Sequence, residues 1–117
     1  MIEFTIIGEV PSKKNNYRIN KNGGFYQGKQ KEIDDLLLQL NVVRNKYTGL
    51  PLKSDCRLNL CVWGSNRKDL NNQIVTICDV LEKSGIIEND RSIKQIEAEK
   101  IIDNKDPRVI IELYEFN

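Results

Sequence analysis

Acidic, amide and basic side chains lie close together in one stretch of the sequence, RKDLNNQIVTICDVLEKSGIIENDRS, which covers residues 67–92. Asp69 and Asn71 are near its start, Asp79 is in its middle and Asp90 is near its end. Carboxylate oxygens are preferred ligands of Mg²⁺, which usually takes one or two of them together with water and substrate phosphate. Such an ion can activate water and neutralise charge that develops on a phosphodiester. The stretch is therefore a candidate metal site, with Asn71 as a weaker ligand that carries no charge.

Each of these residues also has a simpler explanation. Asp69 directly precedes an apolar periodic segment, where an aspartate commonly caps the N-terminus of a helix. Asp90 is typical of a turn, and Asp79 is typical of a solvated helix surface. Arg67 and Lys68 are explained equally well as ordinary surface charge. The stretch by itself leaves both a metal site and a capped helix open.

A basic segment, SKKNNYRINK, covers residues 12–21 in the first third of the chain. Lysine and arginine can neutralise the backbone phosphates of nucleic acid, and asparagine can hydrogen-bond to them. A solvated basic loop that is balanced by acids elsewhere is the alternative explanation. The combination of this segment with the acidic stretch favours a function on nucleic acid. The candidate DNA-contacting residues are Lys13, Lys14, Asn16, Arg18, Arg67 and Lys68.

The composition describes a folded protein without an overall basic character. The 117 residues suffice for one domain, 39% of them are apolar, and the formal net charge is +1. A nucleic-acid-binding surface would therefore depend on how the charges are arranged. The sequence has no histidine, which excludes Ser-His-Asp and Cys-His catalytic groups and histidine-rich zinc sites. Catalysis would have to use carboxylates, lysines, hydroxyls, water or metal.

The three cysteines, Cys56, Cys61 and Cys78, form no CxxC pair. Their odd number argues against a disulfide scaffold, and their spacing argues against a zinc site. We expect reduced, partly buried thiols in a cytoplasmic protein. No apolar run is long enough to span a bilayer, and the first residues do not resemble a signal peptide.

The order of the hydrophobic patterns predicts a single α+β domain over residues 1–117. Runs of β-branched and aromatic residues indicate strands, and apolar spacings of three and four indicate helices. Asn22-Gly23-Gly24 is typical of a tight hairpin turn. We expect a small mixed sheet with two helices packed on one face. The predicted elements are strands at 2–8, 56–64, 91–102 and 107–116, a hairpin at 17–27, and helices at 29–47 and 70–84.

The second helix is the most clearly predicted element. Its apolar residues recur at helical spacing, with Asp69 as the N-cap and Gly85 as the residue that ends it. Because the chain returns from this helix to a strand of the same sheet, we expect Asp90 to come close to Asp69. The predicted buried stripe consists of Leu70, Ile74, Ile77, Cys78 and Leu81.

Over most of its length the chain resembles the RusA family of Holliday-junction resolvases, which are endonucleases of bacteria and their phages. The similarity is strongest at residues 67–93, where the family has a basic residue, Asp-Leu-Asp-Asn, a helix with a further Asp and Leu, Gly, and a closing Asp-Asp. VPSKKNNYR at residues 10–18 is similar to the family's Pro-Ser-(Lys)-Asn-Asn segment followed by arginine. The resemblance implies an α+β homodimer that binds four-way DNA junctions in recombination and repair. It also implies symmetric nicks made with Mg²⁺, for which Mn²⁺ can substitute.

The family pattern assigns roles to four residues of this chain. Asp69 matches its first metal-binding aspartate, Asn71 occupies the place of the second, and Asp90 matches the last. These three form the implied catalytic and metal-binding set. Asp79 matches the acid within the helix and is a further candidate metal ligand.

Three positions depart from the family pattern. Asn71 replaces the second Asp of Asp-Leu-Asp-Asn, Asn89 replaces the first Asp of the closing pair, and Val75 replaces a lysine that is catalytically important in some members. A neighbouring segment could supply the missing cation, but the loss of a carboxylate at position 71 weakens the attraction for a divalent metal. Three explanations of Asn71 stay open: a weak or inactive natural homologue, an engineered Asp→Asn change, or a ligand set in which another acid such as Asp79 compensates.

Three hypotheses of function follow. The first is a Mg²⁺-dependent endonuclease that acts on four-way DNA junctions. The second is a homologue that binds branched DNA without cutting it. The third is a small dimeric interaction domain that does not bind nucleic acid.

Overall fold

The computed structural model describes residues 1–12, 17–19, 25–27 and 30–116, with side chains for residues 1–12 and 30–116. Every helix and strand that the sequence predicts is present. A short 3₁₀ helix, η1, adds one turn before the fifth strand. In chain order the elements are β1 (Ile2–Ile7), β2 (Tyr17–Ile19), β3 (Phe25–Gln27), α1 (Gln30–Lys46), β4 (Cys56–Gly64), α2 (Leu70–Lys83), η1 (Asp90–Ser92), β5 (Ile93–Ile102) and β6 (Arg108–Glu115).

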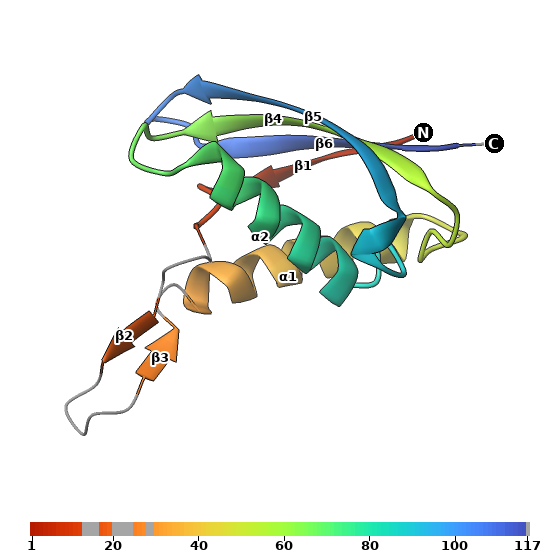
Figure 1. Cartoon of the computed structure of the whole chain (residues 1–117), viewed down its shortest axis with the longest axis horizontal. Helices are drawn as coiled ribbons and strands as arrows, with labels where there is room; N and C mark the ends of the chain where they lie inside the picture. The colour runs from red at the N-terminus through yellow and green to blue at the C-terminus, as the bar shows by residue number, and fades with distance from the viewer. Residues whose placement is uncertain (13–16, 20–24, 28–29, 117) are drawn as a thin grey trace.

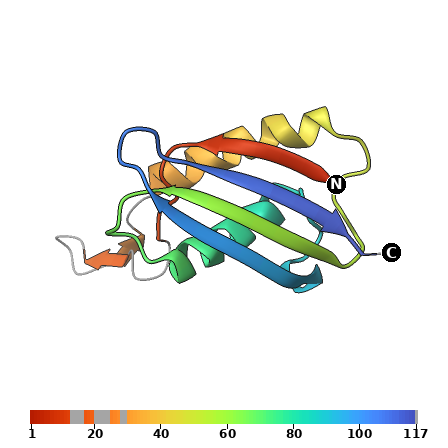
Figure 2. The same cartoon turned by 90° about the horizontal axis from the view of Figure 1, so that it is seen from above.

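Four strands form one mixed sheet in the order β1-β6-β4-β5. The β4 and β5 strands are parallel, whereas β6 is antiparallel to both of its neighbours. The two helices lie on the same face of this sheet (Figure 1), and the view from above shows the four strands side by side in front of them (Figure 2). The predicted α+β fold, with a mixed sheet and two helices on one face, is confirmed.

The side of the sheet that faces the helices forms the core. Burial alternates along β4, so that Leu58, Leu60 and Val62 are buried while Cys61 and Trp63 lie on the opposite, partly exposed side. Leu58, Leu60 and Val62 alternate with Cys61 and Trp63 in the sequence, and this pattern predicts that the two sets lie on opposite faces of a strand. The first helix covers the β1 side of the same face, and its buried residues are Ile33, Leu36, Leu40 and Val43.

The buried stripe of α2 is displaced from the predicted one. Ile77 and Leu81 are buried as expected, but Gln73 and Thr76 are fully buried beside them. Apolar periodicity misses these two because it assigns polar residues to solvent, whereas both side chains find acceptors inside the fold. The predicted stripe residues that are only partly buried are Leu70, Ile74 and Cys78.

Both ends of α2 are set as the sequence predicts. Asp69 is the N-cap, and Gly85 adopts a left-handed conformation with φ of 80° directly after the C-cap residue Ser84. The chain then passes through η1 into β5. This connection fixes where the two ends of the acidic stretch lie.

The predicted hairpin is present as the separate pair β2 and β3, which are hydrogen-bonded only to each other. Its predicted turn at Asn22–Gly24 lies outside the described residues. None of the described helices has the length and apolar character that crossing a membrane requires.

Candidate metal and nucleic-acid-binding site

Asp69 lies at the point where the chain leaves the β4 side of the sheet and enters α2. Its side-chain Oδ1 accepts a hydrogen bond from the Asn71 N–H at 2.9 Å. Its main-chain carbonyl accepts the Gln73 N–H at 3.0 Å, which is the first bond of the helix. Both Asp69 and Asn71 are exposed. Asp69 therefore caps the helix with one oxygen and keeps its carboxylate accessible to solvent.

Asp90 lies at the other end of α2. Its main-chain N–H donates to the Glu82 Oε1 at 2.9 Å, so the last turn of α2 holds the start of η1. Asp79 is also in this half of the helix, where it forms an ion pair with Lys83 at 3.3 Å. Asn89, one of the departures from the family pattern, caps η1 by accepting the Arg91 N–H at 2.8 Å.

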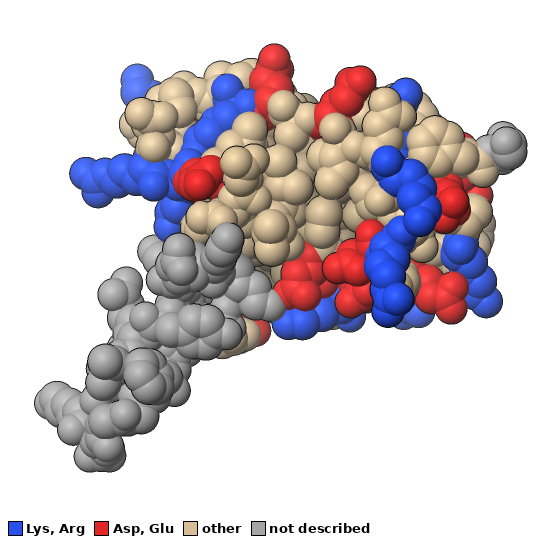
Figure 3. Space-filling model, in the orientation of Figure 1, with Lys and Arg blue, Asp and Glu red and all other residues tan. Residues whose placement is uncertain are grey.

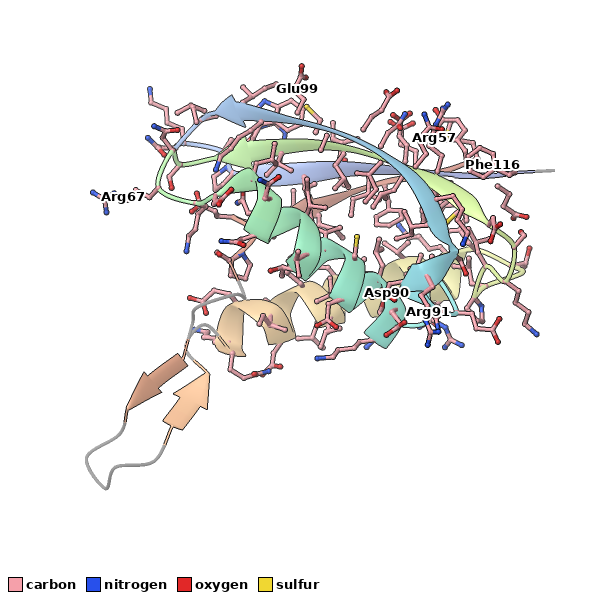
Figure 4. The ribbon with its side chains drawn as sticks, in the orientation of Figure 1. Arg57, Arg67, Asp90, Arg91, Glu99 and Phe116 are labelled. Atoms are coloured by element: carbon pink, nitrogen blue, oxygen red, sulfur yellow. The ribbon has the colours of Figure 1, made fainter. Side chains whose placement is uncertain are left out.

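The expectation that Asp69 and Asp90 come together is wrong within one chain. Because β4 and β5 are parallel, α2 runs back along the sheet, and the start of β5 lies at the far end of the helix. The 14 residues of α2 span about 21 Å. Figure 4 shows Arg67 beside the first end and Asp90 at the second.

The acidic residues of a single chain do not fit a complete Mg²⁺ site. Among the described residues no group of three or more Asp, Glu or Cys side chains is placed to hold a metal ion. Asp69 and Asn71 offer oxygen at one end of α2, and Asp79 and Asp90 offer it at the other. Each end therefore carries part of the ligand set that the sequence predicts.

Between these ends, α2 exposes one apolar side chain. Val75 is 54% exposed and lies on the side of the helix away from the sheet, opposite the buried Gln73 and Ile77. It is four residues after Asn71 and four before Asp79, so it lies between the two partial ligand sets. This is the position at which some family members have lysine.

A buried amide network lies behind the first turns of α2. The Gln73 Nε2 donates to the Val10 carbonyl at 2.9 Å, and the Gln73 Oε1 accepts from the Lys100 Nζ at 3.1 Å. Lys100 also donates to the Lys68 carbonyl, directly before Asp69. A cation thus lies beside this turn, supplied by β5 rather than by position 75.

Sequence patterns gave no role to Gln73 or Lys100. The available signal was the position of Gln73, three residues after Leu70 and four before Ile77, on an otherwise apolar helix face. A polar residue on such a face needs a buried partner, because an unpaired buried amide is costly. The identity of the partner depends on contacts across 63 residues of chain and was not accessible to local patterns.

A second contact fixes the chain just before the basic segment. Glu9 accepts the Ser65 N–H at 2.6 Å and the Ser65 hydroxyl at 3.1 Å. Together with the bond from Gln73 to Val10, it attaches the chain before the basic segment to the β4–α2 loop. Lys13, Lys14 and Asn16 lie outside the described residues, and Arg18 is described only as a backbone position of β2, paired with Tyr26. The basic segment therefore starts beside the Asp69 end of α2.

Arg67 and Lys68 lie in the loop between β4 and α2. Lysine and arginine side chains gather over this end of the sheet in Figure 3, and Arg67 extends away from the body of the protein in Figure 4. The main-chain N–H of Arg67 donates to the Ser65 hydroxyl at 3.3 Å, which shapes the loop. A cavity of about 640 Å³ opens here, lined by Glu9, Ser65, Asn66, Arg67, Lys68, Ile102 and Asn104.

The cysteines do not provide a nucleophile. All three are free thiols. Burial raises the pKa of Cys78 to about 11, and the nearby negative charge of Asp90 adds to the effect. Burial also raises the pKa of Cys56 and of Cys61 above the ordinary value. Protonated thiols are weak nucleophiles, so the chemistry of this surface rests on carboxylates, amides and cations.

The chain matches a known protein family over most of its length. Residues 9–114 match the family described as Endodeoxyribonuclease RusA. The chain is also similar to the Crossover junction endodeoxyribonuclease RusA of Aquifex aeolicus (strain VF5), with 24% identity over 112 residues that cover 94% of this chain and 89% of the relative. The matched region contains both ends of α2, the β4–α2 loop and the basic segment. The chain therefore belongs to the RusA family of endodeoxyribonucleases.

Proposed function

We propose that this protein is a Mg²⁺-dependent endodeoxyribonuclease that resolves four-way DNA junctions by paired nicks during recombination and repair. The observation that carries the proposal is the convergence at the N-terminus of α2. Asp69 keeps an accessible carboxylate there, beside the exposed Arg67 and the start of the basic segment. Phosphodiester hydrolysis requires cations that hold the phosphate, and beside them a carboxylate that attracts the metal ion. Mg²⁺, or Mn²⁺ in its place, would supply an activated water and neutralise charge on the phosphate.

The separation of Asp69 from Asp90 supports a site that is shared between two copies of the chain. If both residues serve one metal ion, as the family pattern implies, a single protomer cannot provide them. Two α2 helices that pack antiparallel across a two-fold axis would bring Asp69 of one protomer next to the partner subunit's Asp90. An isologous dimer repeats this contact twice. Two equivalent sites suit a four-way junction, which itself has two-fold symmetry.

The outer surface of the helix layer carries three exposed apolar side chains. Leu38 and Val42 on α1 are 65% and 57% exposed, and Val75 on α2 is 54% exposed. All three lie on the sides of their helices away from the sheet, and the two helices are in contact. Exposed apolar side chains that adjoin one another can form a protein–protein contact. The helix layer is therefore the surface that we assign to the homodimer.

A second function, binding of branched DNA without cutting, is favoured by one observation. Asn71 occupies the exposed first turn of α2, and that turn contains no acidic residue. An amide oxygen attracts Mg²⁺ less strongly than a carboxylate does. A protein with this change would keep its basic surface and its affinity for DNA while losing most of its activity.

Cleavage of a labelled four-way junction tests the proposed function. The chain is incubated with the junction and with a linear duplex of the same sequence, in Mg²⁺ and in EDTA. Symmetric nicks in the junction alone, and only with Mg²⁺, would support the endonuclease. Tight, salt-sensitive binding with no cutting would favour the second function. Neither binding nor cutting would leave the interaction domain as the remaining hypothesis.

A further inference from the structure

We propose that the cavity between the β4–α2 loop and the β5–β6 turn binds a backbone phosphate of DNA. Arg67 supplies the cation and Asn66 and Asn104 supply amide donors. Lys105 directly follows Asn104 in the chain and adds a second cation at the β5–β6 turn. The cavity measures about 640 Å³ and is open to solvent, so a polymer can enter it from the side. This inference rests on the proposed function and extends it to the β5–β6 turn, which carries no assigned role.

The electrostatic character of the cavity favours an anion. Its lining contains one carboxylate, Glu9, and both oxygens of that group are engaged by Ser65. Among the described residues Arg67 forms no ion pair. Ile102 is 52% exposed and gives one wall an apolar surface, against which a deoxyribose can pack. Cations, amides and one apolar wall are the contacts that a nucleic-acid backbone takes.

The two aspartates of the β5–β6 turn are engaged by groups of the turn itself. The Asp103 Oδ1 accepts the N–H groups of Lys105 and Asp106 at 3.0 and 3.3 Å. Arg108 forms ion pairs with Asp103 and Asp106 at 3.8 and 3.2 Å. The Arg108 guanidinium in turn stacks over the Trp63 ring at 4.2 Å from the ring centre. The charges of Asp103, Lys105, Asp106 and Arg108 therefore sum to zero, and the exposed Lys105 has no acidic partner among the described residues.

The cavity is at the same end of the molecule as Asp69. Lys68 lines it and directly precedes Asp69 in the chain. Glu9, on another wall, directly precedes Val10, which Gln73 holds against α2. A phosphate bound in the cavity would therefore keep a DNA strand beside the N-terminus of α2.

A pair of double variants with the same change of net charge provides the test. Asn104→Asp with Lys105→Ala removes one cation and adds one anion at the β5–β6 turn. Asn45→Asp with Lys46→Ala makes the identical change at an exposed Asn-Lys pair in the last turn of α1, at the opposite end of the molecule (Figures 1 and 2). Binding of a fluorescent four-way junction is measured by anisotropy in EDTA, over a series of salt concentrations.

The proposal predicts that the 104/105 variant binds the junction about tenfold more weakly than the 45/46 variant at equal salt. It also predicts that the slope of log affinity against log salt concentration is smaller in magnitude by about 1 for the 104/105 variant, because one phosphate contact is lost. Lys105→Ala alone should change in the same direction, and Lys105→Arg should bind like wild type. Thermal melting of each variant checks the fold. Equal binding by the two double variants would overturn the phosphate site alone, whereas failure of the wild type to bind would overturn the proposed function and this site together.

Discussion

Asp69 and Asp90 lie at opposite ends of α2, so one chain holds these two carboxylates apart by the length of a 14-residue helix. The resemblance of residues 67–93 to the family pattern implies that both residues bind metal. The parallel pairing of β4 with β5 makes the separation unavoidable, because the helix must cross the sheet to connect them. A site that uses both residues therefore needs a second copy of the chain, and this requirement is the centre of the proposed function.

The two roles of Asp69 can be separated by two substitutions. Asn is as good an N-cap as Asp, so Asp69→Asn should change the free energy of unfolding by less than about 0.5 kcal/mol. Asp69→Ala should cost about 1 kcal/mol, because the bond to the Asn71 N–H is lost. Both should abolish Mg²⁺-dependent junction cleavage while junction affinity stays the same or rises. Urea unfolding and the cleavage assay measure these effects.

Two outcomes would contradict this account of Asp69. Cleavage by Asp69→Asn at the wild-type rate would leave Asp69 with the capping role alone. Loss of folding in Asp69→Asn would mean that the lost cleavage reports stability rather than metal binding.

The effect of Asn71 can be measured by restoring the acid. Asn71→Asp places a carboxylate in the first turn of α2, where it should stabilise the helix by about 0.3–1 kcal/mol through the helix dipole. It should also raise Mg²⁺-dependent cleavage about tenfold or more, equivalent to about 1.4 kcal/mol of transition-state stabilisation. Asn72→Asp is the matched control, because it adds the same charge one residue later. An equal gain of cleavage in both variants would show a general charge effect and would exclude a ligand role for position 71.

The buried amide of Gln73 should contribute to stability more than an exposed amide with similar bonds. Gln73→Leu leaves the Val10 carbonyl and the Lys100 ammonium without this partner and should lower the free energy of unfolding by about 1–3 kcal/mol. Gln39→Leu is the control, since the Gln39 amide bonds to the main chain of Ile7 in a more exposed setting. Urea unfolding at neutral pH measures the loss of unfolding free energy in each variant. A loss in Gln73→Leu no larger than in Gln39→Leu would contradict the role of the network.

The sequence predicts the helices and strands of this fold because each of them depends on residues that are close together in the chain. Alternation along residues 56–64 and helical spacing along residues 29–47 each describe one face of one element. Asp69 begins α2 through a hydrogen bond to a residue two positions later, and Gly85 ends it through its left-handed backbone conformation. These features need no knowledge of the rest of the chain.

The parts of the site that the sequence did not predict depend on topology. The pattern of residues 67–92 gives an acid before a helix and an acid after it, but the direction of β5 relative to β4 decides whether they meet. The bond from Gln73 to Val10 joins residues that are 63 positions apart. The cavity likewise combines the β4–α2 loop, the end of β5 and Glu9, whose proximity only the folded sheet creates.

The thiol of Cys78 should weaken the fold at alkaline pH. Burial raises the pKa of Cys78 from 9.0 to about 11, so between these values the unfolded chain releases a proton that the folded chain keeps. Unfolding is therefore favoured as pH rises through this range. The stability advantage of wild type over Cys78→Ala should shrink as the pH rises from about 9 to about 11, as measured by urea unfolding. A constant difference would mean that the thiol has its ordinary pKa in the folded protein.

The most direct test of the shared site is the cleavage activity of mixed dimers. One chain carries Asp69→Asn and the other Asp90→Asn, and the two are co-expressed with different affinity tags. Both are made in the wild-type background or in the Asn71→Asp background, whichever cuts junctions faster. The heterodimer is purified through both tags. In a shared arrangement one of its two sites combines an intact Asp69 with the partner subunit's intact Asp90, and the other site lacks both. The account predicts that the heterodimer regains Mg²⁺-dependent single nicks in a four-way junction, although each variant homodimer is inactive. A heterodimer as inactive as the two homodimers would contradict the shared site, because it would place Asp69 and Asp90 of the same chain in one catalytic centre.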